Sequence, residues 1–379
     1  MSNAFSPSPL FQRVERARRR KHKFTDTHIT LAHGSGGRAM HELVEGLFLE
    51  YLRNPLLEQL EDQAVFELEK TNQLAAINGN GHNSMRLAYT TDSYVVSPLF
   101  FPGGDIGTLA INGTVNDLAM SGARPLYLSA GFILEEGFPV DELRRVLESM
   151  RTAAIEAGVE VVTGDTKVVQ KGGVDKLFIN TSGIGVIESP VQLGAGRAQP
   201  GDKVILSGTL GDHGTTIMIS RGELELETDI ESDCAPLQSL VADMIDEASR
   251  LSSLDGLHSL RDPTRGGLAT TLNELALSAE VCIEIVEDLI PVREEVKGAC
   301  EILGLDPLYV ANEGKLVTIV STDLAESLVE CMRQNRYGRE ACIIGEVKAE
   351  PGGIVTMRTG FGGTRIVDML VGEQLPRIC

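Results

Sequence analysis

The chain has 379 residues, of which 42% are hydrophobic and 23% charged, and it contains no tryptophan. This composition is typical of a globular protein, and the length favours two domains. No apolar stretch is long enough to span a membrane, and no secretory signal is visible, so we expect a cytoplasmic protein. The net charge of −20 argues against a nucleic-acid partner held by a general basic surface.

The N-terminal residues 1–27 form a basic arm. Between residues 13 and 23 seven lysines and arginines stand against a single acid, Glu15. We interpret this arm as a solvated extension, and the alternative is an electrostatic tether to an acidic partner or to the acidic body itself.

The C-terminus ends on a cysteine, Cys379. The other five cysteines show no paired metal spacing and are interpreted as core or surface thiols. Gly372 and Pro376 argue against a helix that runs to the end, so we expect residues 361–379 to be a mobile tail. The tail alone fits an incidental thiol, and it also fits a thiol that carries a chemical group from one place to another.

A glycine-rich segment, His33-Gly34-Ser35-Gly36-Gly37, precedes a helical pattern of apolar residues. Such a loop can present bare backbone N–H groups to an anion. It lacks the Gly-Lys-Ser/Thr of a Walker loop, and an ordinary flexible turn fits it equally well.

Three acidic residues lie within or directly after predicted elements of the first domain, which we place at residues 28–190. Asp92 follows a strand at 87–90, and Asn116-Asp117 interrupts an apolar helix over 109–120. That polar pair serves either an internal hydrogen bond or a Mg²⁺ ion, which prefers oxygen ligands.

The third acid comes after an amphipathic helix predicted over 140–157 and a strand over 159–162. Asp165, Thr166 and Lys167 come directly after this strand. Asp165 and Lys167 form either a surface ion pair or part of a polyphosphate–metal site that they share with the other acids. A strand over 178–187 closes the domain, and a connector spans 191–203.

The second domain, residues 204–360, opens with a strand at 204–208. Asp262 followed by Pro263 predicts the N-terminus of a helix. With Arg261 and Arg265 nearby, this N-terminus could bind a phosphate or another anion. Glu313 lies in a turn before a strand over 317–320, and it is either a solvated turn residue or a positioned base.

Together these blocks resemble the HypE family of hydrogenase maturation proteins, within the PurM-like ATP-binding superfamily. The matching stretches are His33 to Gly37, residues 91–122, residues 162–167, Arg261 to Gly267, Asn312 to Gly314 and the ending Pro376-Arg377-Ile378-Cys379. The superfamily blocks alone fit several ATP-using enzymes, including aminoimidazole ribotide synthetase and selenophosphate synthetase. The terminal Pro-Arg-Ile-Cys narrows the match to HypE.

The resemblance implies two α/β domains, the first of which pairs with its copy in a homodimer to complete a β-barrel. It implies that a HypF partner places a carbamoyl group on Cys379. The chain would then use ATP and Mg²⁺ to dehydrate this thiocarbamate to a thiocyanate. The cyano group would pass to a HypC–HypD complex and become a cyanide ligand on the iron of a nickel–iron hydrogenase.

The resemblance also implies roles for individual residues. Asp92, Asp117 and Asp165 would bind Mg²⁺, with support from Asn116 and Thr166. Lys167 would stabilise the transferring phosphoryl group, and Glu313 would be the base near the thiocarbamate nitrogen. The nucleotide site would also include His33, Gly34, Gly36, Gly37, Asp262 and Arg265.

Two other functions predict different behaviour. A small-molecule synthetase on the same scaffold would keep its physiological activity without Cys379. A scaffold that only assembles maturation proteins would show neither nucleotide turnover nor Mg²⁺ dependence.

Overall fold

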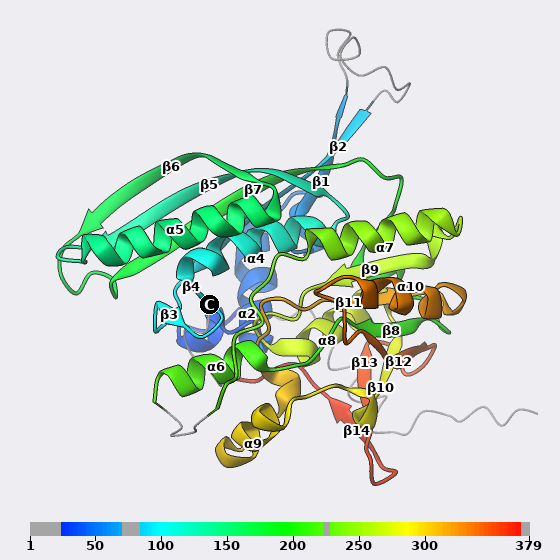
Figure 1. The fold of residues 1–379 in the computed structure, drawn as a ribbon. Helices are drawn as coiled ribbons and strands as arrows, with labels where there is room; N and C mark the ends of the chain where they lie inside the picture. Colours follow the sequence, from blue (N-terminus) through cyan, green and yellow to red (C-terminus); the bar gives the residue numbers. More distant parts are fainter. Residues whose placement is uncertain (1–23, 70–83, 223–227, 373–379) are drawn as a thin grey trace, which may run out of the picture.

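The computed structural model describes residues 24–69, 84–222 and 228–372, which form two α/β domains (Figure 1). The N-terminal domain is built on a five-stranded sheet of order β1-β2-β7-β5-β6, in which only β5 and β6 are parallel neighbours. Its strands are β1 (Ala64–Glu69), β2 (Ser84–Tyr94), β5 (Arg124–Glu135), β6 (Glu160–Val169) and β7 (Leu177–Ile187), and a short ribbon joins β3 (Phe100–Phe101) to β4 (Gly104–Asp105).

One face of this sheet is covered by helices α4 (Ile106–Met120) and α5 (Val140–Ala157), as Figure 1 shows. Helix α5 is amphipathic and buries one stripe of apolar residues, and it ends where Gly158 takes a left-handed conformation. Helix α4 is buried on nearly every side because it lies between the sheet and the C-terminal domain. The Asp105 side chain caps α4 by accepting the N–H groups of Gly107 and Thr108.

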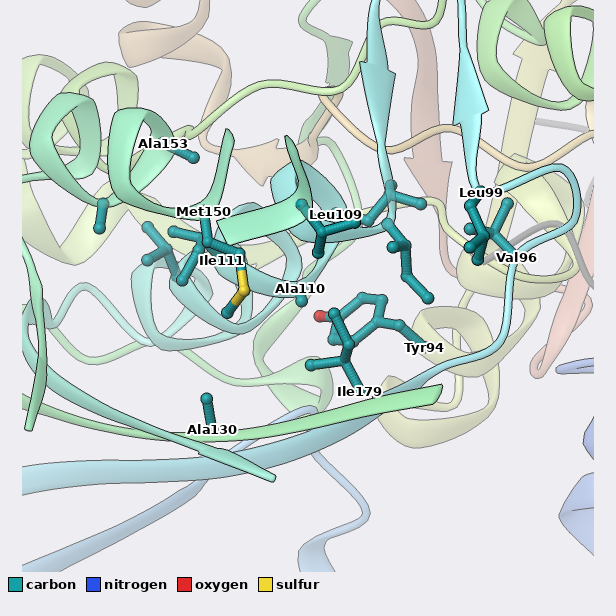
Figure 2. Close-up of a cluster of buried hydrophobic side chains, with 14 of the residues drawn as sticks. Tyr94, Val96, Leu99, Leu109, Ala110, Ile111, Ala130, Met150, Ala153 and Ile179 are labelled. Carbon is teal, nitrogen blue, oxygen red and sulfur yellow. The ribbon is translucent and has the colours of Figure 1, made fainter. Parts of the chain in front are cut away.

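The core of the N-terminal domain lies between the sheet and these two helices. Figure 2 shows Tyr94 and Ile179 of the sheet side packing near Leu109 and Ala110 of α4. The same apolar cluster includes Ile217 and Ala311 of the C-terminal domain, so the two domains share buried contacts.

The opposite face of the sheet carries exposed apolar side chains. Tyr89, Tyr127 and Ile133 are 46%, 48% and 41% exposed. Strand β6 forms one edge of the sheet and is exposed along almost its whole length. An exposed sheet face next to an open strand edge is the usual signature of a surface that pairs with another chain.

The C-terminal domain is built on a seven-stranded mixed sheet of order β14-β13-β10-β12-β8-β11-β9. Its strands are β8 (Lys203–Leu206), β9 (Leu257–Arg261), β10 (Cys282–Val286), β11 (Val317–Val320), β12 (Cys342–Lys348), β13 (Ile354–Arg358) and β14 (Thr364–Val367). Its helices are α6 (Asp212–Ser220), α7 (Gln238–Arg250), α8 (Gly267–Ala279), α9 (Glu294–Leu303) and α10 (Thr322–Gln334).

A short helical segment precedes the first sheet and packs beside the C-terminal domain. It consists of η1 (Leu31–Gly34), α2 (Arg38–Leu43), a π-helical stretch η2 (Val44–Phe48), α3 (Leu49–Leu52) and η3 (Leu57–Gln59). Contacts of His41 with Glu274 and of Arg38 with Asp368 hold this segment against the second domain. Among the described helices, none is long and apolar enough to cross a bilayer.

Two sequence predictions need correction. The strand predicted over 159–162 continues to Val169, so Asp165, Thr166 and Lys167 lie within β6 and not in a loop beyond it. The tail predicted over 361–379 begins later, because residues 364–367 form β14 and pair with β13. The basic arm up to residue 23 and the last residues 373–379 lie outside the described part of the chain.

Candidate active site

Four aspartates from both domains line one cavity of about 570 Å³. Asp62 precedes β1, Asp92 lies near the end of β2, Asp117 lies on α4, and Asp262 follows β9. Asp92 and Asp117, two predicted site residues, therefore lie in one cavity with Asp262. Asp62 was not predicted from the sequence, because it precedes strand β1 by two residues, whereas Asp92 and Asp165 follow predicted strands.

The pairing of β2 with β7 explains how these side chains meet. Asp92 pairs with Thr181, and Thr181 is fully buried under α4, so the Asp92 side chain points to the helix-covered face. Thr90 points to the same face, and its hydroxyl oxygen lies 2.8 Å from Asp117 Oδ2. Alternation along β2 and one turn of α4 thus place the acids at a common site.

The carboxylates of this cavity repel one another. Burial raises the pKa of Asp117 well above its usual value, and Asp262, Asp62 and Asp92 raise it further. Burial raises the pKa of Asp262 to about 8, again with a contribution from Asp62. The pKa of Asp62 rises to about 6 through burial, and Arg261 partly offsets this rise. The cavity therefore concentrates negative charge that a cation would neutralise.

Two arginines border these acids. The Arg261 side chain is only 5% exposed and pairs with Asp62 and, at 3.3 Å, with Glu61. Arg265 reaches from the turn before α8, where Nη2 lies 3.4 Å from Asp92 and Nη1 donates to the Gly34 oxygen at 3.3 Å. Arg261 therefore forms ion pairs with the neighbouring carboxylates. Arg265 contacts both the acidic cavity and the glycine-rich loop.

The glycine-rich loop fits tightly between two parts of the second domain. Gly36 lines the cavity at a φ of +75°, and a Cβ there would lie 2.5 Å from the Arg265 oxygen. A Cβ on Gly37 would lie 2.3 Å from the Leu370 oxygen. Neither position tolerates a side chain, so the glycines allow close backbone approach. Gly34 contributes its carbonyl to Arg265, as described above.

His33 plays a structural part in this loop. Its Nδ1 accepts the Thr30 N–H at 3.0 Å, and its Nε2 lies 3.1 Å from Asp26 Oδ2. The ring is buried and does not line the cavity. The prediction that His33 binds the nucleotide is therefore not supported for its side chain, since both ring nitrogens hold the loop itself.

Asn116 is likewise structural. Its Nδ2 donates to the Ala235 oxygen at 3.0 Å, and its Oδ1 accepts the Leu237 N–H at 2.7 Å. Both ends of the amide are used inside the protein, and Asn116 does not line the cavity, so the structure shows the internal hydrogen bond that was one of the two alternatives. Asn116 also lies 3.4 Å from the Glu313 oxygen and so ties α4 to that turn.

Glu313 is buried at the interface of the two domains. Its N–H donates to Asp233 Oδ1 at 3.0 Å, and its Oε1 is buried without a hydrogen-bond partner. Burial raises the pKa of Glu313 well above its usual value, and Asp92, Asp233 and Asp262 add to the rise. The solvated-turn alternative is therefore excluded. Glu313 does not line the cavity of the four aspartates but interacts electrostatically with two of them.

Asp165, Thr166 and Lys167 lie apart from this cavity. Asp165 and Lys167 form an ion pair at 3.1 Å in which both side chains are 71% exposed. The Lys167 ammonium and the Thr166 N–H lower the pKa of Asp165. Asp165 of β6 pairs with Gly131 of β5, and Gly131 pairs with Asn180 of β7, which is exposed. Residues that pair directly point to the same face, so the Asp165 side chain points to the open face of the sheet.

Asp92 and Asp165 therefore point to opposite faces of one sheet. The prediction that they bind one metal ion fails within a single chain. In the described residues, no three acidic, histidine or cysteine side chains are arranged to hold a metal by themselves.

The C-terminal tail leaves the described structure beside the cavity. Arg38 N–H donates to the Leu370 oxygen at 2.9 Å, and the Ser35 hydroxyl donates to the Gly372 oxygen at 3.1 Å. The segment that leads to Cys379 is thus fastened to the glycine-rich loop. Cys379 itself lies outside the described residues.

Comparisons with known proteins agree with this arrangement. Models of the AIR synthase related protein family match twice, the N-terminal domain over residues 61–187 and the C-terminal domain over residues 199–358. Carbamoyl dehydratase HypE of Azotobacter vinelandii is 55% identical over 93% of this chain and 97% of that protein. The chain belongs to the HypE family.

Two solved structures extend the comparison. A HypE structure in complex with ATP is 49% identical, has a TM-score of 0.74, and covers 93% of this chain and 100% of that one. A HypE–HypF complex gives 46% identity and a TM-score of 0.77, over 86% of this chain and 99% of that one. The two-domain PurM-like fold, the HypE family and the interpretation as a carbamoyl dehydratase are thereby confirmed.

Proposed function

We propose that this HypE protein uses ATP to dehydrate a carbamoyl group on its own Cys379 to a thiocyanate. The observation that carries the proposal is the attachment of the tail segment Leu370–Gly372 to a glycine-rich loop that borders a cavity of four aspartates. Residues 373–379 can span at most about 25 Å when fully extended. The terminal thiol is therefore within reach of this cavity and can also be presented to a partner outside it.

ATP and Mg²⁺ fit the cavity by its chemistry. Asp92 and Asp117 would hold Mg²⁺, and Asp62 and Asp262 supply further oxygen ligands. Mg²⁺ usually completes its coordination with water and substrate phosphates, which suits a site that side chains alone do not close. Burial and the neighbouring carboxylates raise the pKa values of Asp117 and Asp262, and bound Mg²⁺ would favour their ionised forms. Arg265 and the backbone of Gly34, Gly36 and Gly37 would face the phosphates.

A homodimer would complete the site. The open face and edge strand β6 of the N-terminal sheet would pair with a second copy and form the β-barrel. In this arrangement Asp165, Thr166 and Lys167 of one chain would complete the cavity of the other. Asp165 and Lys167 are both 71% exposed in one chain and occupy alternate positions of β6 on the open face, which supports this assignment.

The reaction follows from these residues. An amide-like oxygen is a poor leaving group, and transfer of a phosphoryl group from ATP to that oxygen lets it leave as phosphate. Lys167 would stabilise the charge on the transferring phosphoryl group. Glu313, whose pKa is raised by burial and by neighbouring carboxylates, would take the last proton from nitrogen as the C≡N bond forms. The first nitrogen proton is lost to solvent as the oxygen is phosphorylated, and the products are the Cys379 thiocyanate, ADP and inorganic phosphate.

Partner proteins would supply and remove the groups. The HypE–HypF complex of a relative supports HypF as the donor of the carbamoyl group. A HypC–HypD complex would accept the cyano group for the iron of a nickel–iron hydrogenase. A tail that can leave the cavity allows both exchanges.

Intact-mass measurement tests the proposal. The protein is incubated with HypF, carbamoyl phosphate and ATP, and the C-terminal peptide is then mapped. A carbamoyl adduct on Cys379 that loses one water only with hydrolysable Mg·ATP supports it. An unmodified Cys379 in the presence of active HypF would favour a small-molecule synthetase. The Cys379→Ala variant should lose product formation and keep ATP binding.

A further inference from the structure

A buried ion pair lies directly behind the turn that carries Glu313. Asp233 Oδ2 and Lys315 Nζ are 3.2 Å apart, and their side chains are 2% and 13% exposed. The other carboxylate oxygen, Asp233 Oδ1, accepts the Glu313 N–H at 3.0 Å. One aspartate therefore contacts the residues on both sides of Gly314.

The two segments touch along their main chains as well. A Cβ on Gly314 would lie 1.8 Å from the Asp233 oxygen and 2.9 Å from the Ala235 nitrogen. No side chain fits at Gly314, so the turn is pressed against residues 233–235. Small movements of Asp233 are therefore transmitted to the main chain at Glu313.

The segment around Asp233 is itself fixed at several points. The Ser232 N–H donates to the Pro102 oxygen at 2.9 Å, and the Ser232 hydroxyl lies 2.8 Å from Nδ1 of the buried His213. Asn116 of α4 holds the Ala235 oxygen, as described above. Asp233 thus connects the Glu313 turn to a rigid frame made by both domains.

The Glu313 side chain needs such a frame. Its Oε1 is buried and lacks a hydrogen-bond partner, so no contact of this oxygen fixes the carboxylate. The position of the main chain then decides where the carboxylate lies. A reacting group misplaced by about 1 Å can lose two orders of magnitude in rate.

We propose that Asp233 is the positioning residue of Glu313, with Lys315 as its buried counter-ion. Asp233 holds the Glu313 main chain through one carboxylate oxygen, and the Lys315 ammonium, 3.2 Å from the other, compensates the buried charge. This inference rests on the proposed role of Glu313 as the base of the dehydration.

A pair of double variants isolates the hydrogen bond from the charge. Asp233→Asn with Lys315→Met removes both charges and keeps an acceptor for the Glu313 N–H, whereas Asp233→Ala with Lys315→Met removes the acceptor as well. Single-turnover dehydration of the carbamoylated full-length protein is measured for each at saturating ATP. We expect the asparagine variant to stay within about threefold of wild type and the alanine variant to fall about 10- to 100-fold below it.

The ATP concentration at half-maximal rate should be the same in both double variants, because Asp233 does not line the nucleotide cavity. A purely structural role would lower the thermal stability and weaken ATP binding along with the rate. Equal rates in the two double variants would overturn the inference.

Should the alanine variant fail to fold, Asp233→Glu provides the second test. It keeps the ion pair but displaces the acceptor, so a wild-type rate in that variant would also overturn it.

Glu313→Gln is measured alongside. If Glu313→Gln is inactive and the two double variants have equal dehydration rates, Asp233 is rejected as the positioning residue and Glu313 remains the base. A fully active Glu313→Gln removes the base itself, whatever the double variants show.

Discussion

Two groups of acidic residues in the N-terminal domain have opposite surroundings. Asp117 is buried among other carboxylates, and its pKa is raised. Asp165 is exposed on the edge strand beside Lys167, and its pKa is lowered. Both belong to sequence blocks shared with HypE proteins, yet in one chain only Asp117 lies in a cavity. The 71% exposure of Asp165 and Lys167 in one chain is the observation behind the proposed site shared by two copies.

The buried group should be the more sensitive to substitution. Asp117→Asn removes a candidate Mg²⁺ ligand from the cavity, and we expect ATP-dependent dehydration to fall on the order of a hundredfold to a thousandfold. The same change relieves repulsion among buried carboxylates, so the melting temperature without Mg²⁺ should rise. Asp246→Asn, on the outer side of α7, is the matched control. A stable, fully active Asp117→Asn would remove Asp117 from the metal site.

The exposed group should affect the reaction without affecting the fold. Lys167→Ala changes a side chain that is 71% exposed, so the melting temperature should stay within about 1 °C of wild type. The dehydration rate should fall about 10- to 100-fold, because the transferring phosphoryl group loses a positive charge. Lys171→Ala, just beyond the same strand, should leave the rate unchanged. Equal rates for both variants would make Lys167 an ordinary surface residue.

The pH dependence of stability should also separate the two groups. The folded-state pKa of Asp262 is raised from 3.8 to about 8, so between these values the folded chain binds more protons than the unfolded chain. The contribution of Asp262 to the free energy of unfolding is therefore fully present below about pH 4 and is lost as the pH rises through about 8. The melting temperature without Mg²⁺ should fall from pH 6 to about pH 8.5.

Substitutions in the two groups sharpen this measurement. Asp262→Asn should flatten the melting profile, since the titrating group is gone, and Mg²⁺ should stabilise the wild type most at the alkaline end. Asp165→Asn should leave the profile unchanged because the Asp165 pKa lies below the window. A wild-type profile that rises between pH 6 and 8.5 would contradict the charged cavity.

The basic arm should have the smallest effect. It lies outside the sequence blocks that match the HypE family, which begin at His33. Removing residues 1–23 should leave the single-turnover rate and the ATP dependence within about twofold of wild type. A large loss of rate would make the arm a functional element, and a loss seen only in the presence of HypF would make it a docking element.

Much of the fold followed from local patterns. The helix predicted over 140–157 is α5, because its apolar residues repeat along one face and Gly158 ends it. The strand predicted over 317–320 is β11, since a short β-branched run is fully buried between β8 and β9. The motif positions Asp92, Asp117 and Asp262 also converge as their chemistry suggested.

The remaining differences come from tertiary contacts. The strand predicted over 159–162 was expected to end before Asp165, but Gly164 lies within β6, where a Cβ would be 2.2 Å from the Ala130 oxygen of the neighbouring strand. Asn116 suggested a ligand, but its amide joins two segments that are 119 and more residues apart in the chain. Asp62 carried too weak a local signal, because a single acid before an edge strand gains meaning only from the acids that it meets.

The most direct measurement mixes two inactive chains. Asp117→Asn and Lys167→Ala chains with different affinity tags are co-expressed, and the heterodimers are isolated and assayed for dehydration. If Lys167 serves the partner's cavity, one of the two sites in each heterodimer is intact, and about half of the wild-type rate should return. A heterodimer as inactive as both parent homodimers would show that Lys167 acts within its own chain and would contradict a site shared between two copies.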